Sequence, residues 1–287
     1  MESVEQLHLL ALNVGLAHHY ADWNWQHVNS PFARIYYVVE GESELILPDG
    51  VHLLRPGYMY FIPPFTTHSC RCNALFVHYY LHVYEDAPDS AGFLDEWNFP
   101  TEIVGGELER MLFERLCKLN PHMALLHSDP TSYDNHLTLK QNITKNRQRT
   151  FSNRVESRGI VFQLFARFLA EGRKGHASID ERIRSSLVYI RQNIRRPITI
   201  SQLAEKANLS KDHYIRLFTR EMGITPLQYV NRKKIEQAQL IMLTRGLPVK
   251  SVAYMLGFED HSYFNRLFRK ISGYTPIGYR EMLTVKN

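Results

Sequence analysis

The first third of the chain alternates short apolar or aromatic segments with turn residues. The candidate strands cover residues 34–39, 43–47, 51–54, 58–62 and 75–84. The clearest turn between them is Pro48-Asp49-Gly50, because proline presets φ and glycine tolerates a positive φ. Several short strands with close glycine and proline turns predict a small β-barrel or sandwich.

Helical periodicity begins after residue 105. Apolar side chains recur every three or four residues from Leu108 to Leu119, and again from about Val155 to Glu171. The apolar set of the second helix is Ile160, Val161, Leu164, Phe165, Phe168 and Leu169. That set is too wide for one packing seam, so it indicates either burial within the domain or a core on one side and a partner on the other. Residues 120–150 are polar and predict no element, whereas the glycine-containing segment 171–179 predicts a linker.

The C-terminal third predicts helices and contains an internal repeat. Residues 201–230 align with residues 251–280. Ala204 matches Ala253 at an offset of 49, and Arg216 matches Arg266 at an offset of 50, because the second turn has one extra residue. A repeat of this length is a strong indication of duplicated supersecondary structure.

Each copy of the repeat predicts a short helix, a tight turn and a second helix, at about residues 198–222 and 248–272. The predicted inward stripes of the second helices are Tyr214, Leu217 and Phe218, and Phe264, Leu267 and Phe268. Ser210 and Asp260 are predicted N-caps, and Gly257 stands where the first helix of its copy needs a positive φ. This is helix-turn-helix geometry, whose second helix fits a DNA major groove about 12 Å wide.

The outward positions of the second helices carry the candidate DNA-binding residues. They are Lys211, Asp212, Ile215, Arg216 and Arg220 in the first copy, and His261, Ser262, Asn265, Arg266 and Arg269 in the second. Asparagine and arginine pair bidentately with adenine and guanine edges. Arg232 is expected to contact phosphates, as are Arg196, Lys233, Lys234, Lys250, Lys270 and Arg280. For Arg216 and Arg266 an internal salt bridge remains the alternative.

Between the copies, residues 227–243 predict a helix about 25 Å long. Its length suits the presentation of two second helices to successive major-groove faces, whose centres lie about 34 Å apart.

Charge supports a polyanionic partner for the C-terminal third. The net charge of the chain is +5, but residues 180–287 hold 19 Lys and Arg against 9 Asp and Glu, while residues 1–179 hold 15 against 20. A basic segment attached to a mildly acidic body favours binding to nucleic acid. A solvated basic surface is the alternative interpretation.

The chain has only three cysteines, and their odd number argues against a disulfide framework. A reducing cytoplasm is therefore expected. Cys70-x-Cys72 lacks the usual two-residue gap of a zinc pair, and two ordinary thiols are expected there. The initial MESVEQLHLL has no secretory pattern. No apolar run approaches the ~20 residues that cross a bilayer, so no membrane partner is expected.

The segment from Gly257 to Arg280 fits the pattern GF-x-D-x-S-Y-F-x-R-x-F-x-K-x-x-G-x-T-P-x-x-Y-R. In these positions the chain resembles the AraC/XylS family of bacterial transcription regulators. The resemblance is strong over about residues 180–287. It extends more loosely to PFARIYYVVEGE at 31–42 and LRPGYMYFIPPFTTHS at 54–69, which look like the cupin-type effector domain of that family.

The resemblance implies a multidomain α and β protein. Residues 1–170 would form a cupin-like β-barrel with dimerisation helices, residues 171–179 a linker, and residues 180–287 an all-α domain with two helix-turn-helix motifs. The implied partners are double-stranded DNA, a small-molecule effector, a second copy of the chain and RNA polymerase, with no cofactor. Whether the helix near 108–119 or that near 155–171 mediates dimerisation stays open.

Metal-dependent cupins carry two histidines and a glutamate on early strands and a further histidine later in the chain. Here Arg34, Tyr36 and Val38 stand at those positions and only His68 is evident, so neither a metal site nor an enzyme is expected. A cupin enzyme with a DNA-binding tail and a repressor that needs no ligand are the alternatives.

The expected effector-binding residues are Trp23, Trp25, Arg34, Tyr36, His68, His78 and Tyr80, with His27 and His82 as further inward-facing candidates. Aromatic rings with fixed polar groups suit a sugar, whose faces are apolar and whose edges are polar. Sugars are also common effectors in the family that the chain resembles. For these side chains, packing in a barrel core is the alternative role.

Overall fold

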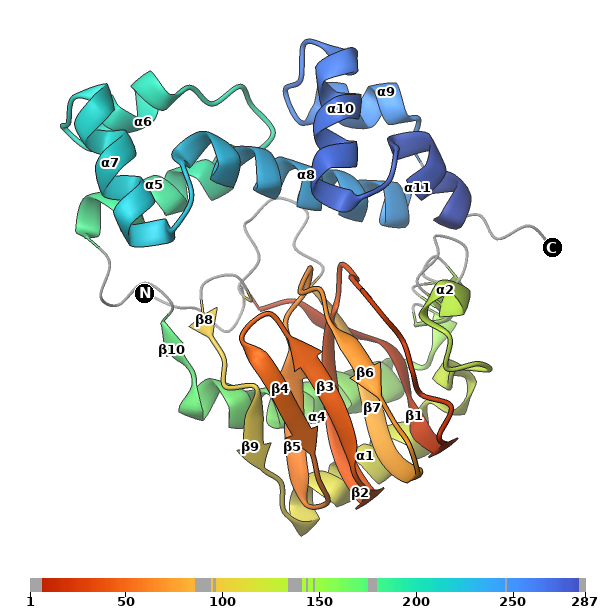
Figure 1. The fold of residues 1–287 in the computed structure, drawn as a ribbon. Helices are drawn as coiled ribbons and strands as arrows, with labels where there is room; N and C mark the ends of the chain where they lie inside the picture. The colour runs from red at the N-terminus through yellow and green to blue at the C-terminus, as the bar shows by residue number, and fades with distance from the viewer. Residues whose placement is uncertain are drawn as a thin grey trace. The chain divides into compact units, whose positions relative to one another are not determined.

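The computed structural model describes residues 7–85, 94, 97–133, 141–142, 144–146, 148–174, 180–245 and 247–283. The described residues fall into two units, one ending at Lys174 and one beginning at Asp180 (Figure 1). The first is a mixed unit of antiparallel sheets and helices, and the second is entirely helical, as the sequence predicts. In neither unit does a described helix combine the length and the apolarity of a membrane span.

The first unit is built on two antiparallel sheets. The larger has the strand order β1-β7-β2-β5-β9, and the smaller has the order β4-β3-β6. The larger comprises β1 (Leu9–Tyr20), β2 (Ala33–Gly41), β5 (Tyr58–Ile62), β7 (Leu75–Glu85) and β9 (Glu102–Val104). The smaller comprises β3 (Ser43–Leu47), β4 (Gly50–Leu54) and β6 (Ser69–Arg71). All five expected strands are present, and the Pro48-Asp49-Gly50 turn joins β3 to β4.

Strand β1 is absent from the sequence-based prediction. Its sequence, LLALNVGLAHHY, is rich in leucine and alanine, which favour helices, and it shows no strict alternation. It is nevertheless a strand because it pairs with β7 along its whole length, from Leu9 opposite Glu85 to Tyr20 opposite Leu75. Tertiary pairing here overrides local propensity.

Helices α1 (Glu107–Leu119) and α4 (Phe151–Glu171) cover one face of the larger sheet (Figure 1). Phe113 and Leu116 of α1 and Leu164 and Phe168 of α4 are buried in one core with strand residues such as Leu81. The wide apolar set of α4 is therefore explained by burial, with only Leu169 partly exposed. On α1, by contrast, Leu108 and Met111 remain exposed.

The other face of the larger sheet packs on the smaller sheet. Tyr36 and Tyr80 from the larger sheet share this second core with Leu45 and Cys70 from the smaller one. Cys70 and Cys72 are buried free thiols, as the sequence predicts. The Tyr60 hydroxyl donates to the carbonyl of Leu53 at 3.0 Å and thereby connects the two sheets.

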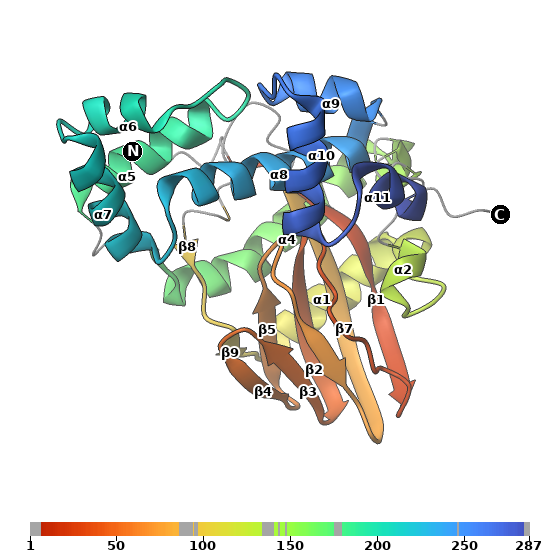
Figure 2. The same cartoon turned by 45° about the horizontal axis from the view of Figure 1, so that its top comes forward.

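The second unit contains α5 (Glu181–Gln192), α6 (Ile200–Lys206), α7 (Lys211–Met222), α8 (Pro226–Arg245), α9 (Val249–Met255), α10 (His261–Ser272) and α11 (Pro276–Leu283). The long helix α8 runs between two groups, with α5–α7 at one end and α9–α11 at the other (Figures 1 and 2). The predicted helices and the repeat of two helical pairs are both present.

Helix α5 ends at Gln192, with Asn193 as its C-cap. Helix α6 begins with a capping box formed by Thr199 and Gln202. Within the expected linker, β10 (Arg173–Lys174) pairs with β8 (Trp97–Asn98), and residues 175–179 lie outside the described residues.

Asn120 fixes the end of α1 and the segment that follows it. Its fully buried Nδ2 donates to the Leu116 carbonyl at 2.7 Å and to the Ser157 hydroxyl of α4 at 3.1 Å. Arg149 Nη1 donates to Asn120 Oδ1. The Asn120 carbonyl accepts from Met123 N in the short 3₁₀ helix η3 (Pro121–Met123), and the chain then reaches Leu125.

We expect Asn120→Ala to lower the free energy of unfolding of the first unit by about 2–3 kcal/mol, because it leaves buried partners unpaired. Urea denaturation followed by tryptophan fluorescence measures this unit alone, since Trp23, Trp25 and Trp97 all lie in it. Lys118→Ala, at an exposed position two residues earlier, is the control and should cost less than about 0.5 kcal/mol. An equal decrease in the free energy of unfolding for the two variants would contradict the role of the buried Asn120 hydrogen bonds in stabilising the first unit.

Candidate nucleic-acid interface and ligand cavity

The two helical pairs, α6–α7 (the first copy) and α9–α10 (the second copy), have matching turns. Leu209 N donates to the Ala204 carbonyl at 3.0 Å, and Phe258 N donates to the Ala253 carbonyl at 3.0 Å. Asn208 and Gly257 occupy equivalent positions and both have a positive φ, of 53° and 69°. The duplication predicted from the sequence is thus a duplication of backbone geometry.

The second helix of each copy begins at the predicted cap. The Ser210 hydroxyl accepts from His213 N, and a carboxylate oxygen of Asp260 accepts from Ser262 N and Tyr263 N. Tyr214 and Phe218 of α7, and Phe264 and Phe268 of α10, are buried. The aromatic stripe therefore faces the core in both copies, and the opposite face is available to a partner.

In the first copy, four of the candidate DNA-binding residues are exposed. They are Lys211, Asp212, Arg216 and Arg220, while Ile215 is half-buried. Arg220 donates to the neighbouring Glu221 carboxylate at 2.8 Å, so its guanidinium is partly engaged. The start of α7 thus presents one lysine and one arginine to solvent.

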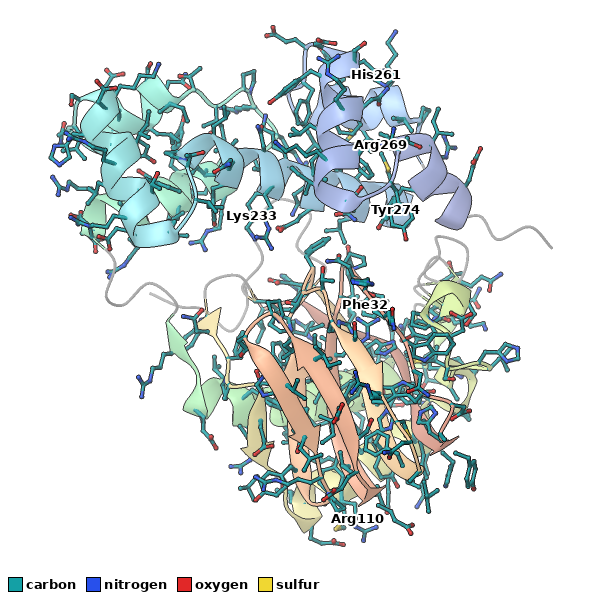
Figure 3. All side chains as sticks on the ribbon, in the orientation of Figure 1. Phe32, Arg110, Lys233, His261, Arg269 and Tyr274 are labelled. Carbon is teal, nitrogen blue, oxygen red and sulfur yellow. The ribbon has the colours of Figure 1, made fainter. Side chains whose placement is uncertain are left out.

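In the second copy, Ser262, Arg266 and Arg269 are exposed, whereas His261 and Asn265 are half-buried. Figure 3 shows His261 and Arg269 along α10, with His261 at its start. Asn265 Nδ2 lies 3.4 Å from His261 Nδ1. His261 Nε2 and Asn265 Oδ1 are buried and have no hydrogen-bond partner among the described residues. Asn265 is therefore less outward than its position in the sequence predicts.

Arg216 and Arg266 form no ion pair with any described residue. The internal salt bridge that sequence reasoning left open is thus not found in the described part of the chain. Arg232 does form one, because its Nε lies 3.1 Å from Glu236 Oε1, although the side chain stays more than half exposed.

Lys234, which was expected to contact DNA phosphates, is buried instead. Its side chain is only 5% exposed. Nζ donates to the carbonyls of Arg196, at 2.9 Å, and Leu256, at 2.6 Å. Burial lowers the pKa of Lys234 to about 8. An ammonium bound to two main-chain carbonyls inside the unit is not available to phosphates.

A cavity of about 740 Å³ lies in the first unit. Five of the seven expected effector-binding residues line it, namely Trp23, Trp25, Tyr36, His78 and Tyr80, together with the further candidate His82. Other lining residues come from β1, including His18 and His19, and from the segments Leu125–Asp129 and Ser132–Tyr133. The Tyr80 hydroxyl accepts from Leu125 N at 2.7 Å, which holds that segment at the wall.

Arg34 and His68 were expected to bind the effector, but they are not among the residues that line the cavity. Arg34 is 2% exposed, donates to the Ser30 hydroxyl at 2.7 Å and stacks over Phe32. His68 Nδ1 lies 2.9 Å from the Thr66 carbonyl. Burial, followed by the nearby Arg34, lowers the pKa of His68 to about 3. Both side chains belong to the packed interior. His27, another inward-facing candidate, is exposed.

Three buried histidines of the cavity wall, His19, His78 and His82, are held neutral. Burial lowers the pKa of His19, and it lowers the pKa values of His78 and His82 well below the ordinary value. The Nδ1 atoms of His78 and His82 are buried and have no partner among the described residues. The rings stack, with 5.4 Å between His19 and Trp23 and 5.3 Å between His19 and His78. The wall therefore offers aromatic surface and unsatisfied polar atoms side by side.

Sequence reasoning missed His19, Asp22 and the segment Leu125–Asp129. Asp22 lies 3.3 Å from His19 Nδ1. The available signal was the pair His18-His19 followed by Asp22, but without β1 it could not be placed. Despite this histidine content, the described residues contain no cluster of three or more metal-ligating side chains.

Comparison with known proteins places the C-terminal unit in a family. Residues 203–282 match the model of a helix-turn-helix domain. The probable transcriptional regulator LumQ of Photobacterium leiognathi is 35% identical over 102 residues, which cover 35% of this chain and 41% of that protein. The arabinose operon regulatory protein of Escherichia coli is 31% identical over 106 residues, which cover 37% and 36%.

The C-terminal unit is an AraC-type helix-turn-helix domain. The chain spans about two fifths of the length of the relatives that this AraC-type domain matches. Those relatives carry the names of transcription regulators. Over 96% of both chains, the structure of unsaturated fatty acid-bound ToxT from Vibrio cholerae aligns with 15% identity and a TM-score of 0.49.

We expect the first unit to lose stability on acidification and the AraC-type domain to be less affected. All buried histidines among the described residues, His19, His68, His78 and His82, lie in the first unit. Their folded pKa values are depressed, so below about pH 6.5 the unfolded chain binds more protons and the free energy of unfolding falls. Each histidine adds at most about 1.4 kcal/mol per pH unit.

Thermal unfolding of the full chain between pH 7.5 and pH 5 checks this expectation. Tryptophan fluorescence follows the first unit, whose midpoint should fall. The far-ultraviolet helical signal is dominated by the second unit, and its midpoint should move less. A first-unit midpoint that is constant or rises as the pH is lowered would contradict the neutral state of these histidines.

Proposed function

We propose that the protein is a DNA-binding transcription regulator in which the two helix-turn-helix copies of one chain bind a single DNA site. The observation that carries this proposal is the repeated surface. After equivalent turns, α7 and α10 bury matching aromatic stripes and leave Arg216 and Arg266 exposed at matching positions. The excess of ten positive charges in residues 180–287 favours a polyanion on that side.

Within each copy, residues near the start of the second helix would contact base edges and the others phosphates. In the first copy the proposed contacts are Lys211, Asp212, Ile215, Arg216 and Arg220. In the second they are His261, Ser262, Asn265, Arg266 and Arg269, with Asn265 turning away from His261 on binding. Arg232 on α8 would contact a phosphate with the exposed part of its guanidinium.

The length of α8 supports simultaneous binding by both copies. Its 20 residues extend about 30 Å, compared with about 34 Å between successive major-groove faces. The copies lie at opposite ends of this helix (Figure 2). One chain would therefore contact two adjacent turns of the groove from one side of the duplex.

We expect Arg216→Ala and Arg266→Ala each to weaken sequence-specific binding by about 1–3 kcal/mol, roughly 5–150-fold, while the protein stays folded. The probe is a duplex selected from a random library with the wild-type protein, and the readout is a gel-shift titration. Arg182→Ala is the control, because Arg182 is exposed on α5 and pairs with its own cap Asp180. Unchanged specific affinity in both variants would show that these arginines do not bind the site.

We further propose that the first unit is a cupin-like effector domain whose cavity binds a sugar or a related neutral metabolite. Trp23 and Trp25 supply aromatic faces, and His78 and His82 supply unpaired polar atoms. No lysine or arginine is among the described residues of its wall, which favours a neutral ligand over an anion. Such an effector would act by binding two states of the regulator with different affinities.

A thermal-shift screen tests the cavity. We expect a monosaccharide or related polyol to raise the melting temperature of the first unit, since a ligand that binds only the folded state stabilises it. Trp23→Ala and His78→Gln should abolish the shift, whereas His52→Gln, outside the cavity, should retain it. A shift given only by anionic or purely apolar ligands would contradict the proposed ligand class.

The remaining assignments are proposals of the same kind. A homodimer is supported by Leu108 and Met111, which leave apolar surface on α1, while the wide apolar set of α4 is largely buried in its own unit. This favours the helix near 108–119 as the contact, and sedimentation velocity of Met111→Glu would test it. A cytoplasmic location and contact with RNA polymerase follow from the proposed function alone.

A further inference from the structure

Three main-chain segments meet at one point inside the AraC-type domain. They are the loop between α5 and α6 at Arg196-Pro197, the end of α9 at Leu256, and the middle of α8 at Lys234. The Lys234 ammonium donates to Arg196 O at 2.9 Å and to Leu256 O at 2.6 Å. It also lies 5.1 Å from the centre of the Phe258 ring. The loop leads into the first copy, and Leu256 begins the turn of the second.

Gly257 packs directly against the Arg196-Pro197 backbone at the same junction. A Cβ on Gly257 would lie 2.8 Å from both Arg196 C and Pro197 N, closer than real Cβ contacts. Its φ of 69° is not by itself the reason for a glycine here, because Asn208 has a φ of 53° at the equivalent place in the first copy. The close approach of the Arg196-Pro197 backbone is what distinguishes the two turns.

We propose that Lys234 and Gly257 are positioning residues that fix the second helix-turn-helix copy relative to the first. Neither is among the residues proposed to contact DNA. The junction joins the loop ahead of the first copy to the turn of the second, so the spacing of α7 and α10 does not depend on α8 alone. The bond from Asn231 Nδ2 to the Tyr263 hydroxyl, at 3.0 Å, adds a further link between α8 and α10.

The junction affects the simultaneous binding of both copies to one DNA site. When the two copies are already held in the geometry of the site, binding of the second half-site has no further ordering cost, so the affinity for the whole site is higher. Loosening the junction should weaken binding to the whole site and leave the affinity of either copy for its own half nearly unchanged. A purely destabilising mutation would instead reduce both to the same extent.

The experiment rests on the proposed DNA-binding function and uses the full chain. A random duplex library is selected with the wild-type protein, and shorter duplexes holding each protected half are then made. Lys234→Met removes the donors but keeps the length of the side chain. Lys206→Met, at the end of α6, also removes one positive charge but leaves the junction intact, because Lys206 is exposed and lies over the Tyr189 ring. Circular dichroism establishes that each variant is folded.

We expect Lys234→Met to weaken binding to the whole duplex at least tenfold and to each half-site duplex less than twofold. The control Lys206→Met should affect all three duplexes equally and slightly. Equal losses on whole and half sites, or no loss, would overturn the positioning role. Failure of the wild-type protein to select any sequence would instead overturn the proposed function.

A second variant covers the case in which Lys234→Met does not fold. Gly257→Asn introduces the residue that the first copy tolerates at this turn, but crowds Arg196-Pro197. Its control, Gly273→Asn, has a similar φ of 82° and open space around the added atom. Gly257→Asn should reproduce the selective loss on the whole site and Gly273→Asn should not. The same behaviour in both variants would contradict the junction.

Discussion

The buried Lys234 ammonium is the constraint on which the geometry of the C-terminal unit depends. Two helix-turn-helix copies joined by one helix can twist and bend relative to each other, since a helix contacts each copy along a narrow stripe. Two charge-assisted hydrogen bonds from the buried ammonium hold the loop ahead of the first copy, at Arg196, and the end of α9, at Leu256, to α8. The cation is retained there because both carbonyls and the Phe258 ring compensate for its lost hydration.

In the first unit, by contrast with Lys234, buried polar groups are left without hydrogen-bond partners among the described residues. Burial lowers the pKa values of His78 and His82 in its cavity well below the ordinary value, their rings stack on Phe76 and Phe32, and no described residue satisfies their Nδ1 atoms. Buried polar atoms without partners are costly, so they are expected where a ligand completes them. In the proposed regulator one unit is thus incomplete until it binds a small molecule, and the other is held ready for DNA.

Much of the second unit was predictable because its signals are local. Ser210 and Asp260 cap helices next to them in sequence, and the aromatic stripe recurs at helical spacing. The spacing of Asn208 and Gly257 follows from the repeat itself. What sequence could not show was long-range: Lys234 looks like any basic residue on an exposed helix until the loop at Arg196 and the turn at Leu256 are folded against it. The half-buried His261–Asn265 pair is a similar case.

In the first unit, more of the structure depends on long-range contacts that the sequence alone does not show. The strands with turn residues at their ends were predicted, whereas β1, whose leucines and alanines favour a helix, depends on pairing with β7. Without β1 neither His19 nor Asp22 could be assigned to the cavity. Arg34 and His68 were expected at its wall because they lie among residues that do line it, but they point into the packed interior, where Ser30 and Thr66 satisfy them.

In the proposed complex, one chain presents two recognition helices to one face of DNA at a fixed spacing. Hydroxyl-radical footprinting of the protein on its selected duplex tests this most directly. We expect two protected patches per chain, about one helical turn or 10 base pairs apart, on the same face of the duplex. A single protected patch per chain, or two patches whose separation varies between bound sequences, would contradict it.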